Sequence, residues 1–220
     1  MTTEETASDT TYRHGMGQLL VLYTQVDRLI MEACAERIAS APDEAAKLAL
    51  AKQVGDESSH VSIQHEWMAR FGTLQTPVIS AAQEEAILAH FRQLDWLEFL
   101  TDMYLCVEAL GSDAVEKVVP LADPGTRESL RIPLQDELDH IAFGISRLKH
   151  ELAQLPPGDR AAFPARASQR IDALKLMLHG MGLNLEQLFE SVWADYGALC
   201  RSVRERKEQV LGIVAEPLTA

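Results

Sequence analysis

The chain has 220 residues, enough for one medium-sized domain to bury a core without disulfides or a structural metal. Hydrophobic residues make up 47% and charged residues 24%, and no apolar run approaches the ~20 residues of a membrane span, so the composition excludes a disordered or a transmembrane chain. The net charge of −13 repels phosphate backbones, and we expect no nucleic-acid partner.

The N-terminal segment and the cysteines indicate the cellular compartment in which we expect the protein. Residues 1–11 are polar and acidic, without the apolar stretch of a signal peptide, and we expect a disordered tail there. Cys34, Cys106 and Cys200 are far apart and form no Cys-x-x-Cys pair, which indicates a reducing environment. Both features favour a cytoplasmic protein.

Apolar residues recur every three or four positions along nearly the whole chain, and strand-like alternation is absent. We therefore expect an all-α protein whose helices end where proline, glycine and capping residues occur. The third predicted helix is long enough to bend. The predicted helices run over residues 12–40, 43–71, 80–121, 124–155, 165–179 and 185–210.

The connections between these helices predict their arrangement. Short links at 41–42 and 122–123 favour two antiparallel hairpins packed as a four-helix bundle, and the longer link at 72–80 is suited to cross between the hairpins. The chain is thus predicted to consist of a tail over 1–11, a metal-binding bundle over 12–155 and a C-terminal helical extension packed on the bundle over 156–220.

The motif Asp-Glu-x-x-His occurs twice, once in the second and once in the fourth predicted helix. Glu57 and His60, like Glu137 and His140, are three residues apart, so each pair shares one helix face and can bind one metal ion. A single such spacing is weak evidence, because it often arises by chance. Two of them in corresponding helices are typical of carboxylate-bridged di-iron or di-manganese sites, in which each remaining helix adds one carboxylate.

The third helix offers Glu98, Glu108 and Glu116 for this role. When its residues are placed at steps of about 100°, Glu108 lies at the edge of the apolar stripe, whereas Glu98 and Glu116 fall well outside it. Glu108 and Glu137 are also about equally far from the 122–123 turn, so antiparallel packing brings them level. We therefore expect Glu108 to contribute the carboxylate.

The first helix offers Asp27, Glu32 and Glu36. Asp27 lies within the apolar stripe of this helix, whereas Glu32 is on roughly the opposite face. Asp27 is also level with Glu57 on either side of the 41–42 turn, while Glu32 would be ~9 Å out of level at 1.5 Å per residue. Asp27 is therefore preferred, with Glu32 as the alternative.

Four acids and two histidines that point inward at one level are prohibitive to bury without cations. Asp56 and Asp136 precede the motif glutamates, and we expect each to orient a histidine across the bundle, although an aspartate at such a position is otherwise a solvated acid. The predicted dinuclear metal centre is formed by Asp27, Glu57, His60, Glu108, Glu137 and His140.

These six residues match, one by one, the ligand pattern of the ferritin-like di-iron carboxylate superfamily, which the sequence resembles over residues 16–150. Asp27 is similar to the aspartate of the radical-forming subunit of ribonucleotide reductase, and the paired motifs resemble those of bacterial multicomponent monooxygenases. The size and the C-terminal helices resemble small single-chain members such as aldehyde-deformylating oxygenase and the phenylacetyl-CoA epoxidase subunits. The resemblance implies a ferritin-like four-helix bundle with additional C-terminal helices.

Three departures narrow this resemblance. The radical tyrosine of ribonucleotide reductase follows the first ligand histidine by one turn, and that position is Gln64 here, which speaks against a radical subunit. The cysteine-ligated module of rubrerythrin is missing. Classical ferritins usually contain one Glu-x-x-His rather than two, so iron storage is less favoured.

Four residues lie one helical turn from the predicted ligands: Tyr23, Gln64, Tyr104 and Gly144. Because the hairpins are antiparallel, we expect all four at the same end of the metal site. Tyr23, Tyr104 and Gln64 would then act as catalytic residues that orient a substrate or relay protons in a space that Gly144 leaves open. In the alternative interpretation, the tyrosines belong to the core and Gly144 permits close helix contact.

The sequence therefore favours a cytoplasmic non-haem di-iron oxygenase or oxidase that uses two iron ions and dioxygen to oxidise a small or medium organic substrate. No flavin or nicotinamide fingerprint is present, so we expect an external electron donor, a reductase or a ferredoxin. Two alternatives stay open: a ferroxidase that handles iron, and a dimanganese or mixed manganese–iron oxidase. The oligomeric state also stays open, with a homodimer as one option.

Overall fold

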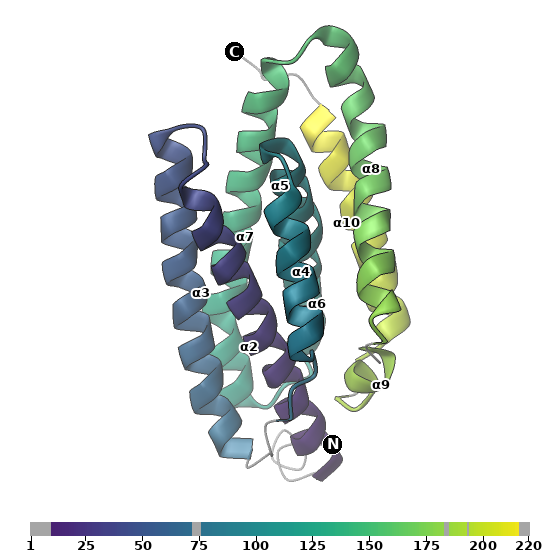
Figure 1. The fold of residues 1–220 in the computed structure, drawn as a ribbon. Coiled ribbons are helices and arrows are strands. Elements are labelled where there is room, and N and C mark those ends of the chain that lie inside the picture. The colour runs from purple at the N-terminus through teal and green to yellow at the C-terminus, as the bar shows by residue number, and fades with distance from the viewer. Residues whose placement is uncertain (1–9, 72–75, 183–184, 193, 216–220) are drawn as a thin grey trace.

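Figure 1 shows the computed structural model of the chain, which describes residues 10–71, 76–182, 185–192 and 194–215. All regular elements of these residues are helices, with no strand among them, which confirms the all-α prediction. The expected tail falls largely on residues 1–9, outside the described residues, and the first helix already begins at Thr10. In the part of the chain that the structure describes, no helix combines the length and apolarity that crossing a bilayer requires.

Four helical segments form the predicted bundle (Figure 1). The first two, α2 and α3, are antiparallel neighbours joined by the predicted short turn. The third segment contains a π-helical turn, η1, between two α-helices, and the fourth is a single long helix. The segments are α2 (Thr10–Ile38), α3 (Glu44–Phe71), α5 (Trp96–Asp102) with η1 (Met103–Val107) and α6 (Glu108–Val118), and α7 (Pro124–Ala153).

The prediction of one helix over 80–121 is wrong. The chain forms α4 (Ala81–Gln93), reverses direction at Leu94 and Asp95, and continues into α5. Asp95 and Glu98 form a capping box: the Glu98 amide donates to the Asp95 carboxylate at 2.8 Å, and the Asp95 amide donates to the Glu98 carboxylate at 3.0 Å. This helix start signal is present in the sequence, but the continuous apolar pattern conceals it.

The additional helix α4 runs parallel to α2. Near its start, Gln25 of α2 donates to the Ile79 carbonyl at 2.6 Å, and at its end Arg37 of α2 donates to the Phe91 carbonyl at 2.7 Å. The crossover between the two hairpins therefore consists of the 72–80 link together with α4. It takes the chain from one end of the bundle to the other, which makes α3 and α7 antiparallel neighbours.

The C-terminal helices differ from the prediction in two places. The helix expected from residue 165 begins earlier, as α8 (Pro157–Gly180), because proline suits the first turn of a helix, where no amide hydrogen is needed. The helix expected over 185–210 is divided into α9 (Leu185–Glu190) and α10 (Tyr196–Ala215). Asp195 starts the second of these by accepting from the Ala198 amide at 2.8 Å. The boundary of the extension at residue 156 stays a prediction.

Gly144 of α7 allows Tyr104 to pack against the helix backbone. A Cβ at position 144 would lie 2.2 Å from both Cβ and Cγ of Tyr104, and these atoms cannot move without shifting η1. The space that was expected beside Gly144 is therefore filled by Tyr104, in line with the close-contact interpretation of this glycine.

We expect Gly144→Ala to destabilise the fold by about 1–3 kcal/mol, the usual cost of overpacking. Gly55→Ala is the matched control, because a Cβ there meets no heavy atom within 4 Å. Alanine is the better helix former, so this control should stabilise the protein by about 0.5–1 kcal/mol. Denaturant titration measures both free energies of unfolding, and equal effects would contradict the packing role of Gly144.

Candidate metal centre

The structure brings the six predicted ligands together in the middle of the bundle. None of them is more than 8% exposed, although all are ionisable. Each of the four bundle segments contributes at least one: Asp27 from α2, Glu57 and His60 from α3, Glu108 from α6, and Glu137 and His140 from α7. The alternative on the first helix, Glu32, is exposed.

Two groups of three side chains could each hold a metal ion. Asp27, Glu57 and His60 form one group, and Glu57, Glu108 and His140 form the other; in each group the candidate ligand atoms lie within 4.8 Å of one another. Glu57 belongs to both, as a bridging carboxylate does. Burial, followed by the charges of Glu108, Asp27 and Glu57, raises the pKa of Glu137 well above the usual range, so the Glu137 carboxylate interacts with both groups.

Glu108 reaches the centre because of the π-helical turn that precedes it. The Glu108 amide donates to the Met103 carbonyl, five residues back. The extra residue in this turn rotates the following helix by about 100° relative to a regular α-helix. Glu108 is therefore 1% exposed, although regular helical spacing puts it only at the edge of the apolar stripe.

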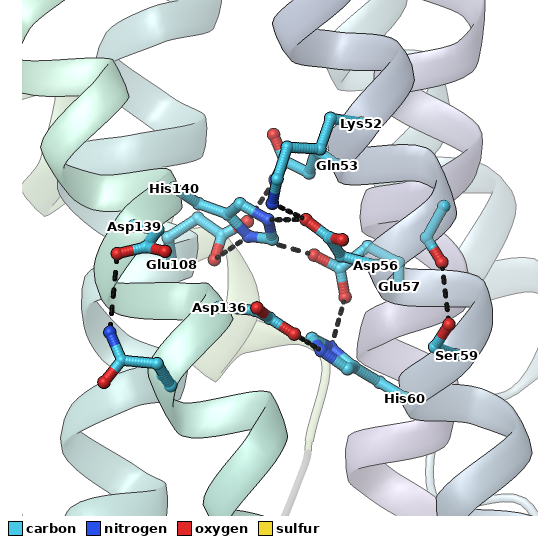
Figure 2. Close-up of polar contacts among 12 residues, drawn as sticks. Lys52, Gln53, Asp56, Glu57, Ser59, His60, Glu108, Asp136, Asp139 and His140 are labelled. Carbon is cyan, nitrogen blue, oxygen red and sulfur yellow. Dashed lines mark hydrogen bonds and ion pairs between the residues drawn. The ribbon is translucent and has the colours of Figure 1, made fainter.

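The two histidines are oriented crosswise between α3 and α7, as Figure 2 shows. Asp136 Oδ2 lies 3.1 Å from His60 Nε2, and Asp56 Oδ2 lies 3.0 Å from His140 Nε2. A proton on Nε2 that is donated to the aspartate leaves the Nδ1 lone pair free to bind a metal. Both Nδ1 atoms face Glu57, at 3.2 Å for His60 and 3.4 Å for His140.

Asp56 is itself fixed by a lysine of the same helix. Lys52 Nζ lies 2.6 Å from Asp56 Oδ2 (Figure 2). Burial alone would raise the pKa of Asp56, but the bonds from Lys52 and His140 outweigh it and lower the pKa. Asp56 therefore remains an anion that can accept the His140 proton.

Gln53 holds the carboxylate of Glu108 and was not predicted from the sequence. Its Nε2 donates to Glu108 Oε1, and its Oε1 accepts a hydrogen bond from the Tyr104 hydroxyl at 2.7 Å. Gln53 precedes Glu57 by one turn on the same buried face of α3, which is the signal that could have identified it.

The prediction that Tyr23, Gln64, Tyr104 and Gly144 lie at one end of the centre is wrong. Tyr104 and Gly144 lie at the end that Gln53 occupies. Gln64 lies at the other end, where it donates to Asp27 Oδ2 at 2.7 Å, and Tyr23 precedes Asp27 on that side. The antiparallel arrangement of α3 and α7, which the crossover through α4 produces, separates the two pairs. We name these the Gln53 end and the Gln64 end.

Burial and mutual repulsion make the metal-free centre strongly basic. Burial, followed by the charge of Glu57, raises the pKa of Asp27 to about 8, and burial also raises the pKa of Glu57. Burial alone would lower the pKa values of His60 and His140, but the surrounding carboxylates outweigh it and raise each to about 9. Protons thus take the place of cations in the centre.

The chemistry of this group fits two divalent metal ions. Its four carboxylates bring a charge of −4 when ionised, which two divalent cations neutralise. Carboxylate oxygens and imidazole nitrogens are ligands that suit iron and manganese. Four buried atoms that face the centre have no hydrogen-bond partner in the described residues: Glu57 Oε1, Glu108 Oε2, Glu137 Oε2 and His140 Nδ1.

Comparison with known proteins supports the fold. No protein-family model and no curated protein matches the sequence. A solved Synechococcus protein with aldehyde deformylating oxidase activity matches with a TM-score of 0.78 and 17% identity, over 94% of this chain and 93% of that one. Two variants of an R2-like ligand-binding oxidase with an aerobically reconstituted Mn/Fe cofactor give TM-scores of 0.62 and 0.61 at 14% identity, over 96% of this chain and 84% of theirs. The chain therefore has the ferritin-like fold of these oxidases.

We expect the metal-free protein to lose stability as the pH rises from 6 to 9. The pKa values of Asp27, His60 and His140 are higher in the folded than in the unfolded chain, so their contribution is present at low pH and is lost as the pH passes through 8 to 9. For each proton that the folded chain binds in excess of the unfolded chain, the free energy of unfolding falls by about 1.4 kcal/mol per pH unit, which lowers Tm by about 3–6 °C.

Thermal unfolding with a chelator and with excess Mn²⁺ tests this expectation. The metal-loaded protein should show little of this pH dependence, because the ions replace the protons. Asp27→Asn is the control variant and should show a shallower slope without metal. A Tm of the metal-free protein that stays constant or increases over this range would contradict the prediction.

Proposed function

We propose that this protein is a non-haem di-iron oxygenase or oxidase that activates dioxygen and oxidises a small or medium organic substrate. The observation on which the proposal rests is the pair of carboxylate–histidine groups that share Glu57. The fold shared with an aldehyde deformylating oxidase and with R2-like oxidases supports it. Two ferrous ions bound by the six ligands would supply the electrons and coordination positions that dioxygen reduction requires.

The chain's own contribution is to hold the ligands. Asp56 and Asp136 keep each histidine in the tautomer that presents Nδ1 to the centre, and they keep its ring from turning. Gln53 fixes the Glu108 carboxylate by a hydrogen bond, and Tyr104 in turn fixes the Gln53 amide by another. Among the described residues, neither Gln53 nor Tyr104 has a buried side-chain atom without a hydrogen-bond partner.

The Gln64 end is where we place the organic substrate. Buried polar atoms there have no hydrogen-bond partner among the described residues, namely Tyr23 Oη, Gln64 Oε1 and Glu137 Oε2. Such atoms cost free energy unless a ligand satisfies them. Further along the same helices the bundle is lined by buried apolar side chains such as Leu20 and Met68. A molecule with a polar group and an apolar chain fits both features.

Electron supply and cellular location follow as parts of this proposal. The reaction needs an external reductase or ferredoxin, because the sequence contains no flavin or nicotinamide fingerprint. We place the protein in the reducing cytoplasm, because Cys34, Cys106 and Cys200 are far apart in the sequence and form no Cys-x-x-Cys pair.

A mixed manganese–iron centre is the second candidate. The R2-like oxidases that share the fold contain an aerobically reconstituted Mn/Fe cofactor, and the ligand types here suit manganese as well as iron. The unpartnered polar atoms at the Gln64 end favour an organic substrate for either metal over a ferroxidase.

Stepwise addition of Fe²⁺ to metal-free protein in air tests the proposal. We expect oxidation to saturate near two irons per chain, because the centre has ligands for two ions. His140→Ala should reduce this number, whereas His179→Ala, which changes a histidine far along α8, should leave it unchanged. Continued oxidation far beyond two irons would favour iron handling, and no oxidation would favour manganese.

We further expect Tyr23→Phe to lower kcat/KM for a medium-chain aliphatic aldehyde by about tenfold, the worth of one hydrogen bond of about 1.4 kcal/mol. Oxygen consumption with an external reductant measures this value. Iron stoichiometry should stay at two, and Tyr196→Phe, a tyrosine of α10, is the control. An unchanged kcat/KM would remove Tyr23 from the substrate site.

A further inference from the structure

The segment that contributes Glu108 contains two further buried carboxylates. Asp102 ends α5 immediately before η1, and Asp113 follows Glu108 in α6. Each is 1% exposed, and neither belongs to the two candidate metal groups. A buried carboxylate requires a charged or hydrogen-bonded partner, so the partners of these two residues show what the segment is fixed to.

The partner of Asp102 is Arg170 of α8. Arg170 Nε donates to Asp102 Oδ1 at 2.7 Å and its Nη2 donates to Asp102 Oδ2 at 2.8 Å, in the two-pronged geometry that fixes orientation as well as distance. The remaining Nη1 donates to Glu98 of α5 at 2.8 Å. His90 of α4 also contacts Asp102, with its Nε2 2.7 Å from Oδ2.

The partner of Asp113 is Arg206 of α10. Arg206 Nε donates to Asp113 Oδ1, and its Nη2 lies 3.4 Å from the Glu116 carboxylate. The two C-terminal helices are also joined to each other, because Lys207 of α10 lies 2.6 Å from Asp172 of α8. The extension therefore contacts the Glu108 segment through one arginine on each side of η1.

This arrangement restrains the π-helical turn. A π-turn is rare and occurs mostly as a single turn within an α-helix, so we expect the segment to relax to regular α-helix unless its ends are fixed. Relaxation would rotate α6 by about 100° relative to α5 and turn Glu108 away from the centre. Asp102 is paired to α8 and Asp113 is paired to α10, and these two helices are joined to each other. The rotation would therefore break at least one of the two buried ion pairs.

We propose that Arg170 and Arg206 are positioning residues of the metal centre, which hold η1 from both ends and thereby keep Glu108 beside His140. The C-terminal extension acts on the metal position formed by Glu57, Glu108 and His140 and leaves the position formed by Asp27, Glu57 and His60 unaffected. The inference rests on the proposed metal centre, and it is independent of the substrate and of the reaction.

The test measures each metal position separately by titration with Co²⁺ under anaerobic conditions. His60→Gln leaves the Glu108 position as the intact one, and His140→Gln leaves the Asp27 position. We expect Arg170→Lys, which retains the charge but loses the two-pronged contact, to weaken Co²⁺ binding about tenfold in the His60→Gln background. In the His140→Gln background the affinity should change less than twofold.

Arg206→Lys provides a second variant with the same expectation, should Arg170→Lys fail to fold. The matched control is Arg92→Lys, since Arg92 of α4 makes a two-pronged contact with Glu36 of α2, through Nε at 2.9 Å and Nη2 at 3.1 Å, outside the Glu108 segment. It should leave both positions unchanged. Amide hydrogen exchange of the metal-free protein adds a readout without metal: Arg170→Lys should speed exchange of the Glu108 amide about tenfold.

The outcomes separate the two proposals. Equal weakening of both positions, or weakening by Arg92→Lys to the same degree, would overturn the positioning role in favour of general destabilisation. Unchanged affinity in all variants would overturn it while leaving the metal centre intact. Failure of the unaltered protein to bind Co²⁺ would overturn the metal centre and the positioning role together.

Discussion

The burial of four carboxylates at the centre of a helical bundle is the constraint on which the rest of the structure depends. Removing each ion from water costs several kcal/mol, and the two histidines cannot neutralise four negative charges. The centre is therefore stable only when it holds cations or protons. The raised pKa values of Asp27 and Glu57 mean that these carboxylates retain protons when no metal is bound. Stability must come from the apolar layers on either side of the centre.

The ligand set was predictable because it depends on local periodicity. Two Glu-x-x-His spacings and the burial of Asp27 follow from the angle and height of residues on straight helices, and the same geometry put Glu108 level with Glu137 at the edge of its apolar stripe. Features that break this regularity were missed. The reversal at Asp95 and the π-turn before Glu108 both interrupt a continuous apolar pattern, and Gln53 depends on a contact between helices that spacing on one helix does not show.

The two ends of the centre have different physical characters. At the Gln53 end, Gln53 pairs with both Glu108 Oε1 and the Tyr104 hydroxyl, so these side chains are fixed by one another, and Glu108 Oε2 alone of this chain lacks a hydrogen-bond partner among the described residues. At the Gln64 end, the hydroxyl of Tyr23 and the amide oxygen of Gln64 have no hydrogen-bond partner within the described part of the chain. A reaction that needs both a fixed metal geometry and an exchange of substrate benefits when metal positioning and substrate binding occur at opposite ends of the centre.

The crosswise aspartate–histidine pairs have a consequence for how the two central helices can move. Each motif supplies the aspartate that the other motif's histidine requires, so His60 depends on α7 and His140 depends on α3. Sliding α3 past α7 by even one helical turn, about 5.4 Å, would break both pairs at once. The two pairs therefore fix the position of α3 along α7. Any opening of the bundle must occur by tilting of these helices or by separation of other helices.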